Sequence, residues 1–169
     1  MNAQAHPKLA MRPMLPADVP LLAEIFRASI EQLTADDYSA AQQDAWAAAA
    51  DDEQEFGARL TSELTLVGTL AGSAVGFASL ADNRRIDMLY VHPAAVGQGA
   101  GKMLCDALEK LAAARGAKEL TVDASDTARD FFAKRGYEAQ QRNTVMLGGE
   151  WLADTTMAKR FVATKESAS

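Results

Sequence analysis

The sequence predicts an α/β protein in which helices cover both faces of a single mixed sheet. β-rich runs alternate with amphipathic helical segments along the whole chain. No internal repeat or low-complexity linker divides it. A chain of 169 residues, 49% of them hydrophobic, can bury one sizeable core. We therefore expect one domain over residues 1–169, with its folded core at about residues 8–162.

The first third of the chain is predicted to be mainly helical. A short strand at Leu9–Met14 opens it. Apolar residues between Val19 and Ile30 recur with the spacing of a helix of about four turns. Ser39 can cap a second helix, which carries Trp46, because its hydroxyl accepts a hydrogen bond from a first-turn amide. Acidic residues open a third helix at 51–60 and complement its dipole.

Strands dominate after residue 62. Three β-rich runs, separated by turn-forming residues, predict an antiparallel meander. A strong amphipathic helix, a short strand, a short helix and a closing hairpin around Gly148-Gly149 follow. The expected segments are strands at 64–70, 74–80 and 85–91, a helix at 103–115, a strand at 120–122, a helix at 127–135, and hairpin strands at 144–147 and from 151.

The composition excludes several classes of protein. A net charge of −6 argues against a nucleic-acid partner, whose phosphates repel an acidic surface. The first ten residues lack the apolar core of a secretory leader, and no apolar run approaches the roughly 18 residues that cross a membrane. Cys105, the single cysteine, cannot form an internal disulfide or a zinc cluster. We expect a cytoplasmic protein without a metal, a membrane or a nucleic-acid partner.

The most informative segment is Leu89–Lys102, in which a β-run ends and alternating glycines lead directly into a helix. Glycine lets the backbone approach a ligand and adopt positive φ. The first N–H groups of a helix have no internal partner and lie at the positive end of its dipole. A diphosphate accepts several such groups together. We therefore predict a phosphate-binding turn at Gly97, Gly99 and Gly101 rather than a flexible connector.

Two common nucleotide motifs do not fit this turn. The triphosphate loop needs G-x-x-x-x-G-K-[ST], but Val96 stands at its first glycine and Met103 at its hydroxyl residue. The dinucleotide fingerprint G-x-G-x-x-G needs a different glycine spacing. A protein that binds some other phosphate-bearing nucleotide stays open as an alternative.

The turn resembles the R/Q-x-x-G-x-G/A signature of the GNAT superfamily of acetyltransferases. Val96 occupies the Arg/Gln position, and Gly99 and Gly101 occupy the two small positions. Downstream, residues 128–137 resemble the family's A-x-x-F-Y-x-K-x-G-F helix and exit. Ser125 stands where the family often has an asparagine that hydrogen-bonds pantetheine. The likeness spans nearly the whole chain.

The resemblance implies a GNAT-like, mostly antiparallel sheet of about six or seven strands, with two splayed parallel strands at its centre. Those strands would be 85–91 and 118–122, and coenzyme A, bound as acetyl-CoA, would lie between them. The residues implied to bind it are Leu89, Tyr90, Val91, Val96, Gly97, Gln98, Gly99, Ala100, Gly101, Lys102, Ser125, Ala128, Phe131, Phe132 and Lys134. Leu89 and Val91 also suit the core, and Lys102, Lys134 and Arg135 suit either phosphates or solvent.

The resemblance also implies transfer of acetyl to a primary amine by direct attack on the thioester. An alkylammonium ion of pKa about 10.4 must first lose a proton. Asp87 is the candidate base or anchor of a base water, with a structural hydrogen bond as the alternative, and Glu31 is a second candidate. Tyr90 and His92 are candidates to contact the acceptor. Phe132 replaces a tyrosine proposed to protonate the leaving thiolate in many relatives, so that acid is absent.

The acceptor stays open among polyamines, aminoglycosides, amino acids, peptide N-termini and protein lysines. Acidic and aromatic residues in the early helices and the last hairpin suit an amine with a hydrophobic body, if they are not simply solvated or buried. They are Asp36, Asp37, Tyr38, Trp46, Arg142, Asn143 and Trp151. A module that binds coenzyme A without catalysis is the alternative, because Phe132 and Val96 depart from the family pattern. Dimers are common among such proteins, so a homodimer is one expected assembly.

Overall fold

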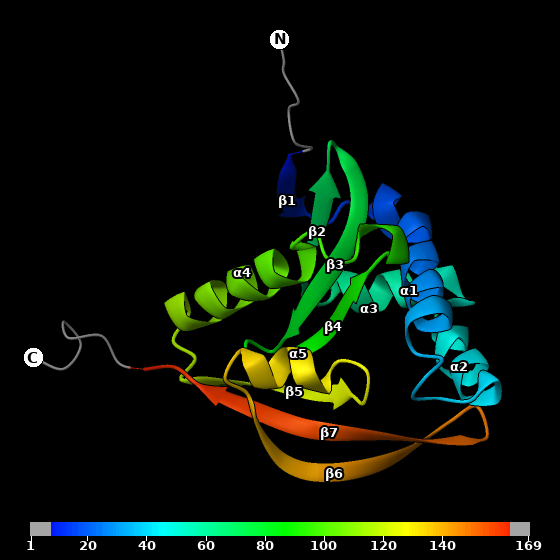
Figure 1. Ribbon diagram of the computed structural model, residues 1–169. Coiled ribbons are helices and arrows are strands. Elements are labelled where there is room, and N and C mark those ends of the chain that lie inside the picture. Colours follow the sequence, from blue (N-terminus) through cyan, green and yellow to red (C-terminus); the bar gives the residue numbers. More distant parts are fainter. Residues whose placement is uncertain (1–7, 163–169) are drawn as a thin grey trace, which may run out of the picture.

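One seven-stranded sheet organises residues 8–162, which the computed structural model describes (Figure 1). Its strand order is β1-β2-β3-β4-β5-β7-β6. Only β4 and β5 are parallel; every other neighbouring pair in it is antiparallel. The strands are β1 (Leu9–Pro13), β2 (Leu64–Leu70), β3 (Ser73–Ala81), β4 (Arg85–Val91), β5 (Glu119–Ser125), β6 (Glu138–Leu147) and β7 (Glu150–Arg160). The predicted mixed sheet with a parallel central pair is confirmed.

Helices cover both faces of this sheet, as predicted (Figure 1). They are α1 (Val19–Leu33), α2 (Ala40–Ala47), α3 (Glu53–Thr61), α4 (Ala100–Ala114) and α5 (Arg129–Lys134), with 3₁₀ turns at Pro16–Asp18, Ala48–Ala50 and Pro93–Ala95. One apolar core packs α4 and α5 against one face. A second core packs α1 and α3 against the other face. Burial of apolar area in these two layers is the main driving force for the fold.

Local signals place the helix ends. The Ser39 hydroxyl accepts a hydrogen bond from the Gln42 amide, and the Gln42 side chain accepts one from the Ser39 amide, which completes a capping box at α2. Asp52 caps α3 in the same way through the Glu55 amide. Both helices therefore begin where their polar residues can satisfy unpaired amides.

A bulge in β4 changes the direction of its side chains. Ser79 of β3 pairs with Met88, but the next residue, Leu80, pairs with Ile86. Asp87 is left without a partner on β3, which is the arrangement of a β-bulge. As a result Ile86 and Met88 point into opposite cores, although they are two residues apart.

The parallel strands β4 and β5 separate soon after they meet. They pair only at Arg85 with Thr121 and at Ile86 with Val122. Both strands continue beyond these pairs without bonding to each other. The splayed opening implied by the sequence is therefore present in the sheet.

The closing hairpin is longer than the sequence indicated. β6 begins at Glu138 rather than at residue 144, and β5 extends over Glu119–Ser125 rather than 120–122. The first part of β6 is polar without alternation, because this edge strand is exposed on nearly its whole length. Its ladder with β7, and not a buried face, defines it. At the tip, Gly148 lies against Ala45 of α2.

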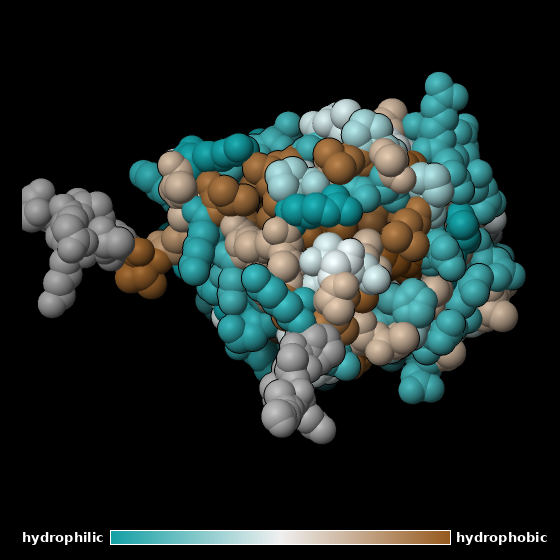
Figure 2. All heavy atoms as spheres, turned by 90° about the horizontal axis from the view of Figure 1, so that it is seen from above, coloured by the Kyte–Doolittle hydropathy of each residue, from teal (hydrophilic) through white to brown (hydrophobic). Residues whose placement is uncertain are grey.

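Figure 2 views the molecule from the top of Figure 1, where β1 and the β2–β3 turn lie, and shows apolar side chains between hydrophilic ones on that side. Several apolar residues of the early elements are indeed exposed, among them Met11, Leu15 and Leu21. None of the helices within residues 8–162 is long and apolar enough to cross a membrane.

Candidate functional site

A cavity of about 160 Å³ occupies the place where β4 and β5 separate. Its lining residues are Tyr38, Trp46, Ile86, Asp87, Met88, Leu89, Tyr90, Val122, Asp123, Ala124, Ser125, Ala128, Phe132, Val145, Leu147, Leu152, Ala153 and Asp154. Eight of the predicted residues are among them: Asp87, Leu89, Tyr90, Ser125, Ala128 and Phe132, together with the acceptor candidates Tyr38 and Trp46. The cavity is therefore the place where most of the predicted central site comes together.

The lining of this cavity comes from both faces of the sheet. Leu89 and Phe132 belong to the core beneath α4 and α5. Met88 and Tyr90 belong to the core beneath α1 and α3. Since successive side chains of a strand point to opposite faces, β4 contributes lining residues on both faces of the sheet. Two ligands can thus approach one another through the sheet.

Asp87 lies in this cavity between two arginines. Arg59 of α3 binds it with two hydrogen bonds, from Nε at 2.8 Å and from Nη2 at 2.9 Å. Arg85 adds a third, from Nη1 at 2.6 Å. Only 3% of the Asp87 side chain is exposed. The carboxylate is thus held in one orientation at the bulge.

Asp87 and the neighbouring Glu63 have pKa values that are shifted in opposite directions. Burial alone would raise the pKa of Asp87, but hydrogen bonds from Arg59, Glu63 and Arg85 outweigh it and lower this pKa to about 2. Burial, followed by the hydrogen bond with Asp87, raises the pKa of Glu63 to about 7. Near neutral pH, Asp87 is therefore ionised and Glu63 is partly protonated.

Aromatic side chains form the wall next to α2. Trp46 Nε1 donates to the Tyr90 hydroxyl at 3.3 Å, and the two rings lie 6.4 Å apart. Tyr38 lies 5.3 Å from Trp46; its hydroxyl donates to the Ala153 carbonyl and accepts from the Asp126 amide. Burial raises the pKa of Tyr90 to about 12, so this phenol stays neutral. The early helices are thus tied to the last hairpin at the cavity.

The predicted glycine turn lies at the start of α4. Gly97 and Gly99 have φ angles of +86° and +91°, which a side chain rarely adopts. Within the described chain, no backbone or side-chain acceptor receives the amides of Gly97 and of residues 99–102. Val96 beside them is 53% exposed. A row of unpaired N–H groups therefore lies at the positive end of a helix.

Gly101 connects this turn to the cavity. A Cβ built on Gly101 would lie 3.7 Å from the Phe131 ring and 3.8 Å from Val91. Phe131 in turn packs edge-on against Phe132, with ring centroids 5.2 Å apart. Val91 and Phe131, which do not line the cavity itself, thus border the path from the turn to it. Ser125 closes the end of β5, where its hydroxyl accepts from the Ala128 amide.

The remaining predicted side chains lie away from the cavity. Arg135 binds Asp106 of α4, so it is engaged by a carboxylate rather than directed at a ligand. Lys102 pairs with the same carboxylate, and Lys134 is exposed. His92 accepts a hydrogen bond from the Ala94 amide and caps the 3₁₀ turn. Glu31 is exposed and does not line the cavity.

Several residues of the cavity and of the Asp87 contacts are not predicted from the sequence. Arg59 and Arg85, which hydrogen-bond Asp87, belong to no motif, and the motifs also do not include Asp123 and Asp154 of the cavity wall. Of these residues, Asp123 has the clearest sequence signal, because it stands between two apolar residues, Val122 and Ala124, which are buried on β5. The Asp87 bulge breaks such alternation on β4, so the direction of that side chain could not be predicted.

A splayed parallel pair beside a glycine turn at a helix start is the architecture of N-acetyltransferases, and comparison with known proteins agrees. A family model described as an acetyltransferase (GNAT) domain matches residues 34–161. The uncharacterised N-acetyltransferase YafP of Escherichia coli (strain K12) is 31% identical over 149 residues, which cover 88% of this chain and 94% of that protein. This chain belongs to the GNAT family of N-acetyltransferases.

Solved structures support this assignment. A GCN5-related N-acetyltransferase from Rhodopseudomonas palustris is 62% identical, with a TM-score of 0.90 over 95% of this chain and 100% of that chain. PaiA N-acetyltransferase from Thermoplasma acidophilum, solved in complex with coenzyme A, is 20% identical, with a TM-score of 0.75 over 91% of this chain and 99% of that chain. The second likeness shows the shared fold.

Proposed function

We propose that this N-acetyltransferase moves the acetyl group of acetyl-CoA to a primary amine by direct attack of the amine on the thioester. The observation that carries the proposal is the cavity between β4 and β5, whose lining comes from both faces of the sheet. The thioester enters from the α4–α5 face and the amine from the α1–α3 face. Both reactants then meet in one place with the geometry of an intramolecular reaction.

The cofactor's diphosphate binds the turn at residues 97–102. The unpaired amides there and the positive end of the α4 dipole support this assignment. The Arg/Gln side chain of the family signature is replaced by Val96, so the main chain supplies the binding. The complex of the Thermoplasma relative with coenzyme A is consistent with the same ligand here.

The pantetheine arm runs from the turn past Val91 and Phe131 into the cavity. The edge of β4 that faces β5 is unpaired beyond Ile86, so its amides are available to the arm and to the thioester carbonyl. An amide directed at that oxygen stabilises the negative charge that develops during attack. Leu89, Ala128 and Phe132 provide the apolar surface around it.

In the reaction, the amine nitrogen forms a bond with the carbonyl carbon and the carbon–sulfur bond breaks. The products are the acetylated amine and the coenzyme A thiol, and one proton leaves the nitrogen while one reaches the sulfur. Asp87 orients a water that accepts the amine proton, because a carboxylate with a pKa of about 2 binds water well but retains a proton poorly. Tyr90, protonated and next to Asp87, borders the same space.

The leaving sulfur departs as a thiolate and takes its proton from water. Phe132 has no hydroxyl to offer. The Tyr137 hydroxyl does not substitute, because it donates to Glu109 at 2.9 Å and does not line the cavity. A thiol with an ordinary pKa of about 8.5 is an adequate leaving group.

Direct transfer, without an acetyl-enzyme intermediate, is supported by the state of Cys105, the single cysteine. It is fully buried outside the cavity, and burial raises the pKa of its thiol to about 12. A protonated thiol is not a nucleophile.

Release of free thiol from acetyl-CoA, measured against a panel of primary amines, tests this function. We expect amine-dependent release with formation of the acetylated amine, and loss of most activity in Asp87→Ala with little change in coenzyme A affinity. Binding of acetyl-CoA without transfer to any amine would instead establish a non-catalytic module, and stabilisation by ATP but not acetyl-CoA would establish a different nucleotide ligand. The cytoplasmic location and the homodimer stay predictions, for cell fractionation and size-exclusion chromatography.

A further inference from the structure

The wall of the cavity formed by β5 and β7 carries two carboxylates, Asp123 and Asp154. Within residues 8–162, neither forms a salt bridge with a lysine, arginine or histidine. Asp87, in contrast, has two arginine partners. The β5–β7 wall therefore gives the acceptor side of the cavity two carboxylates that have no ion-pair partner within the described residues.

A short ladder of hydrogen bonds fixes these two carboxylates. Asn143 Nδ2 donates to Asp154 Oδ1 at 2.9 Å and to the Thr156 hydroxyl at 2.8 Å. The Thr156 hydroxyl donates to Asp123 Oδ1 at 2.6 Å. Each carboxylate thus uses one oxygen, and the second oxygen of each receives no hydrogen bond from the part of the chain described here. The ladder orients the two groups and leaves each with an acceptor atom.

Partial burial distinguishes Asp154 from a carboxylate on an ordinary acidic surface. Burial, opposed by the Asn143 hydrogen bond and assisted by the charge of Asp123, raises the pKa of Asp154. The charge of Arg142 opposes this rise in the pKa of Asp154, but its guanidinium is bound by both oxygens of Asp126. Asp154 is half-buried and Asp123 is exposed, and a cation bound near both carboxylates relieves the repulsion between their like charges.

The aromatic wall next to β7 complements a cation with an aliphatic body. Trp46 and Tyr38 line the cavity with their rings 5.3 Å apart, and Tyr90 is neutral beside them. Aromatic faces attract ammonium groups and cover methylene chains. A ligand that spans the cavity thus meets aromatic surface and carboxylates together.

We propose that the amine acceptor carries a second cationic group, which Asp123 and Asp154 bind while the first amine attacks the thioester. The inference rests on the function proposed above and narrows its acceptor to diamines, polyamines and related dicationic amines. Asp123 and Asp154 are then specificity-determining residues, since they contact the substrate at a distance from the reacting carbon.

The test compares three acceptors of one chain length: an aliphatic diamine, the monoamine, and the amino alcohol in which a hydroxyl replaces the second amine. We expect kcat/KM for the diamine to exceed that of the other two by about tenfold or more, which is the scale of one charge-assisted hydrogen bond. Asp123→Asn and Asp154→Asn, which keep the shape of the side chain, should each remove most of this preference, because they lower kcat/KM for the diamine much more than for the monoamine. The effect on the diamine should also weaken with added salt.

Glu24→Gln is the matched control, because it removes one negative charge from an exposed position of α1 that does not line the cavity. It should keep the diamine preference. Equal rates for all three acceptors, or equal losses on all three in the aspartate variants, would overturn the inference while leaving acetyl transfer established. No transfer to any amine would overturn the proposed function instead.

Discussion

Phe132 lies where a hydroxyl would meet the departing sulfur in the proposed reaction, yet only 2% of the residue is exposed. Its ring packs edge-on against Phe131 and Tyr137, with centroids 5.2 Å apart in both pairs. One edge of the residue still lines the cavity. The same side chain thus stabilises the core and borders the cavity of the proposed reaction, so a hydroxyl can be added while the packing of the ring is retained.

Phe132→Tyr should therefore leave turnover intact or raise it by up to about tenfold, because a hydroxyl near the sulfur can supply a proton. The measurement is kcat by thiol release, together with coenzyme A affinity by calorimetry. Tyr137→Phe is the control, since its hydroxyl binds Glu109 and not the cavity. A collapse of turnover in Phe132→Tyr, with normal cofactor binding, would contradict the assignment of this position.

Glu63 illustrates a different property of a single residue, the pH dependence of stability. Its pKa is raised to about 7 by burial and by the neighbouring Asp87, from an ordinary value of 4.5. The folded protein therefore retains a proton that the unfolded chain releases between these two values, and the stability due to this group falls as the pH rises through 7. Asp87 titrates below this window, because its pKa is about 2.

Glu63→Gln should remove this loss. The quantity compared is the melting temperature of the variant minus that of the unmodified protein. We expect this difference to be about 2–4 °C larger at pH 8 than at pH 5, which is the shift that about 1 kcal/mol produces in a chain of this length. Thermal unfolding at both pH values measures it. A difference that does not change with pH would show that the Glu63 proton has no such role.

Elements differ in how well the sequence predicts them, and the reason is how each is stabilised. Strands β1 to β4, helix α4 and the glycine turn follow local signals, namely periodicity, capping and glycine spacing, and all lie close to their predicted bounds. The first half of β6 has no such signal, because it depends on its ladder with β7. The cavity wall likewise required the register that places Asp123 beside Thr156. Tertiary pairing of this kind is not encoded within a short window.

Two glycines at the ends of α4 allow the effect of the glycine turn on cofactor binding to be measured separately from its effect on stability. Gly97 precedes the helix at φ +86° and Gly116 follows it at φ +92°, and a Cβ at either position would meet nothing within 4 Å. Alanine at either one should therefore destabilise the fold by a similar amount, about 1 kcal/mol, because of the positive φ alone. Only Gly97→Ala should also weaken coenzyme A binding, by about tenfold, since it disturbs the proposed diphosphate site.

Isothermal titration with coenzyme A and thermal unfolding of both variants make this comparison. Gly116→Ala is the control, because it carries the same backbone strain away from the turn. Equal cofactor affinities in the two variants would show that the main-chain amides at residues 97–102 do not bind the cofactor, whatever the effect on stability.

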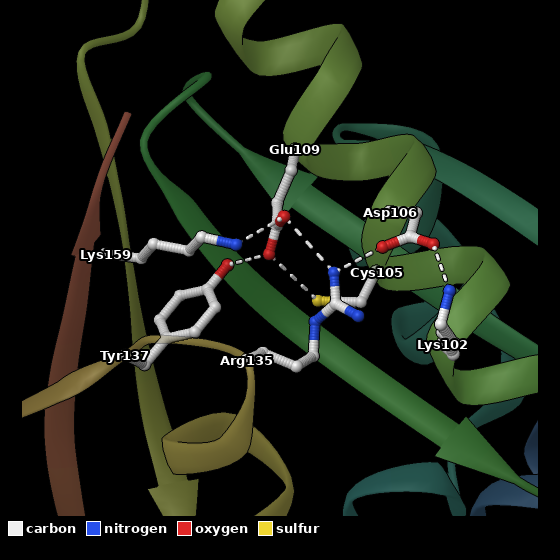
Figure 3. Close-up of polar contacts among 7 residues, drawn as sticks. All are labelled: Lys102, Cys105, Asp106, Glu109, Arg135, Tyr137 and Lys159. Atoms are coloured by element: carbon white, nitrogen blue, oxygen red, sulfur yellow. Dashed lines mark hydrogen bonds and ion pairs between the residues drawn. The ribbon is translucent and has the colours of Figure 1, made fainter. Parts of the chain in front are cut away.

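At the scale of the whole molecule, a buried polar cluster joins the helix that starts at the glycine turn to the last strand (Figure 3). Glu109 of α4 is its centre: it accepts hydrogen bonds from Tyr137 at 2.9 Å and Lys159 of β7 at 3.0 Å, and lies 3.1 Å from Arg135. Its side chain is 12% exposed. The cluster therefore connects α4, at the proposed cofactor side of the sheet, to the hairpin that carries the proposed acceptor wall.

Glu109→Gln should destabilise the protein at neutral pH by about 1–3 kcal/mol, because Lys159 and Arg135 lose the charge that compensates them. Burial would raise the pKa of Glu109, but its hydrogen bonds with Lys159 and Tyr137 and the charge of Arg135 lower it overall. The stabilisation is therefore present above the ordinary value of 4.5 and is lost as the pH falls through the lowered pKa, the opposite direction to Glu63. The difference in melting temperature between variant and unmodified protein should thus be large at pH 7 and shrink in acid.

Asp106→Asn is the matched control, one helical turn from Glu109 on α4. Its carboxylate also binds Arg135, but its side chain is 39% exposed, so water replaces much of the lost interaction and the cost should stay below about 1 kcal/mol. If both variants lose the same small amount of stability, the cluster acts as a set of surface ion pairs. In that case the association of α4 with the hairpin depends mainly on the apolar core, which contains Leu108 of α4 and Met157 of β7.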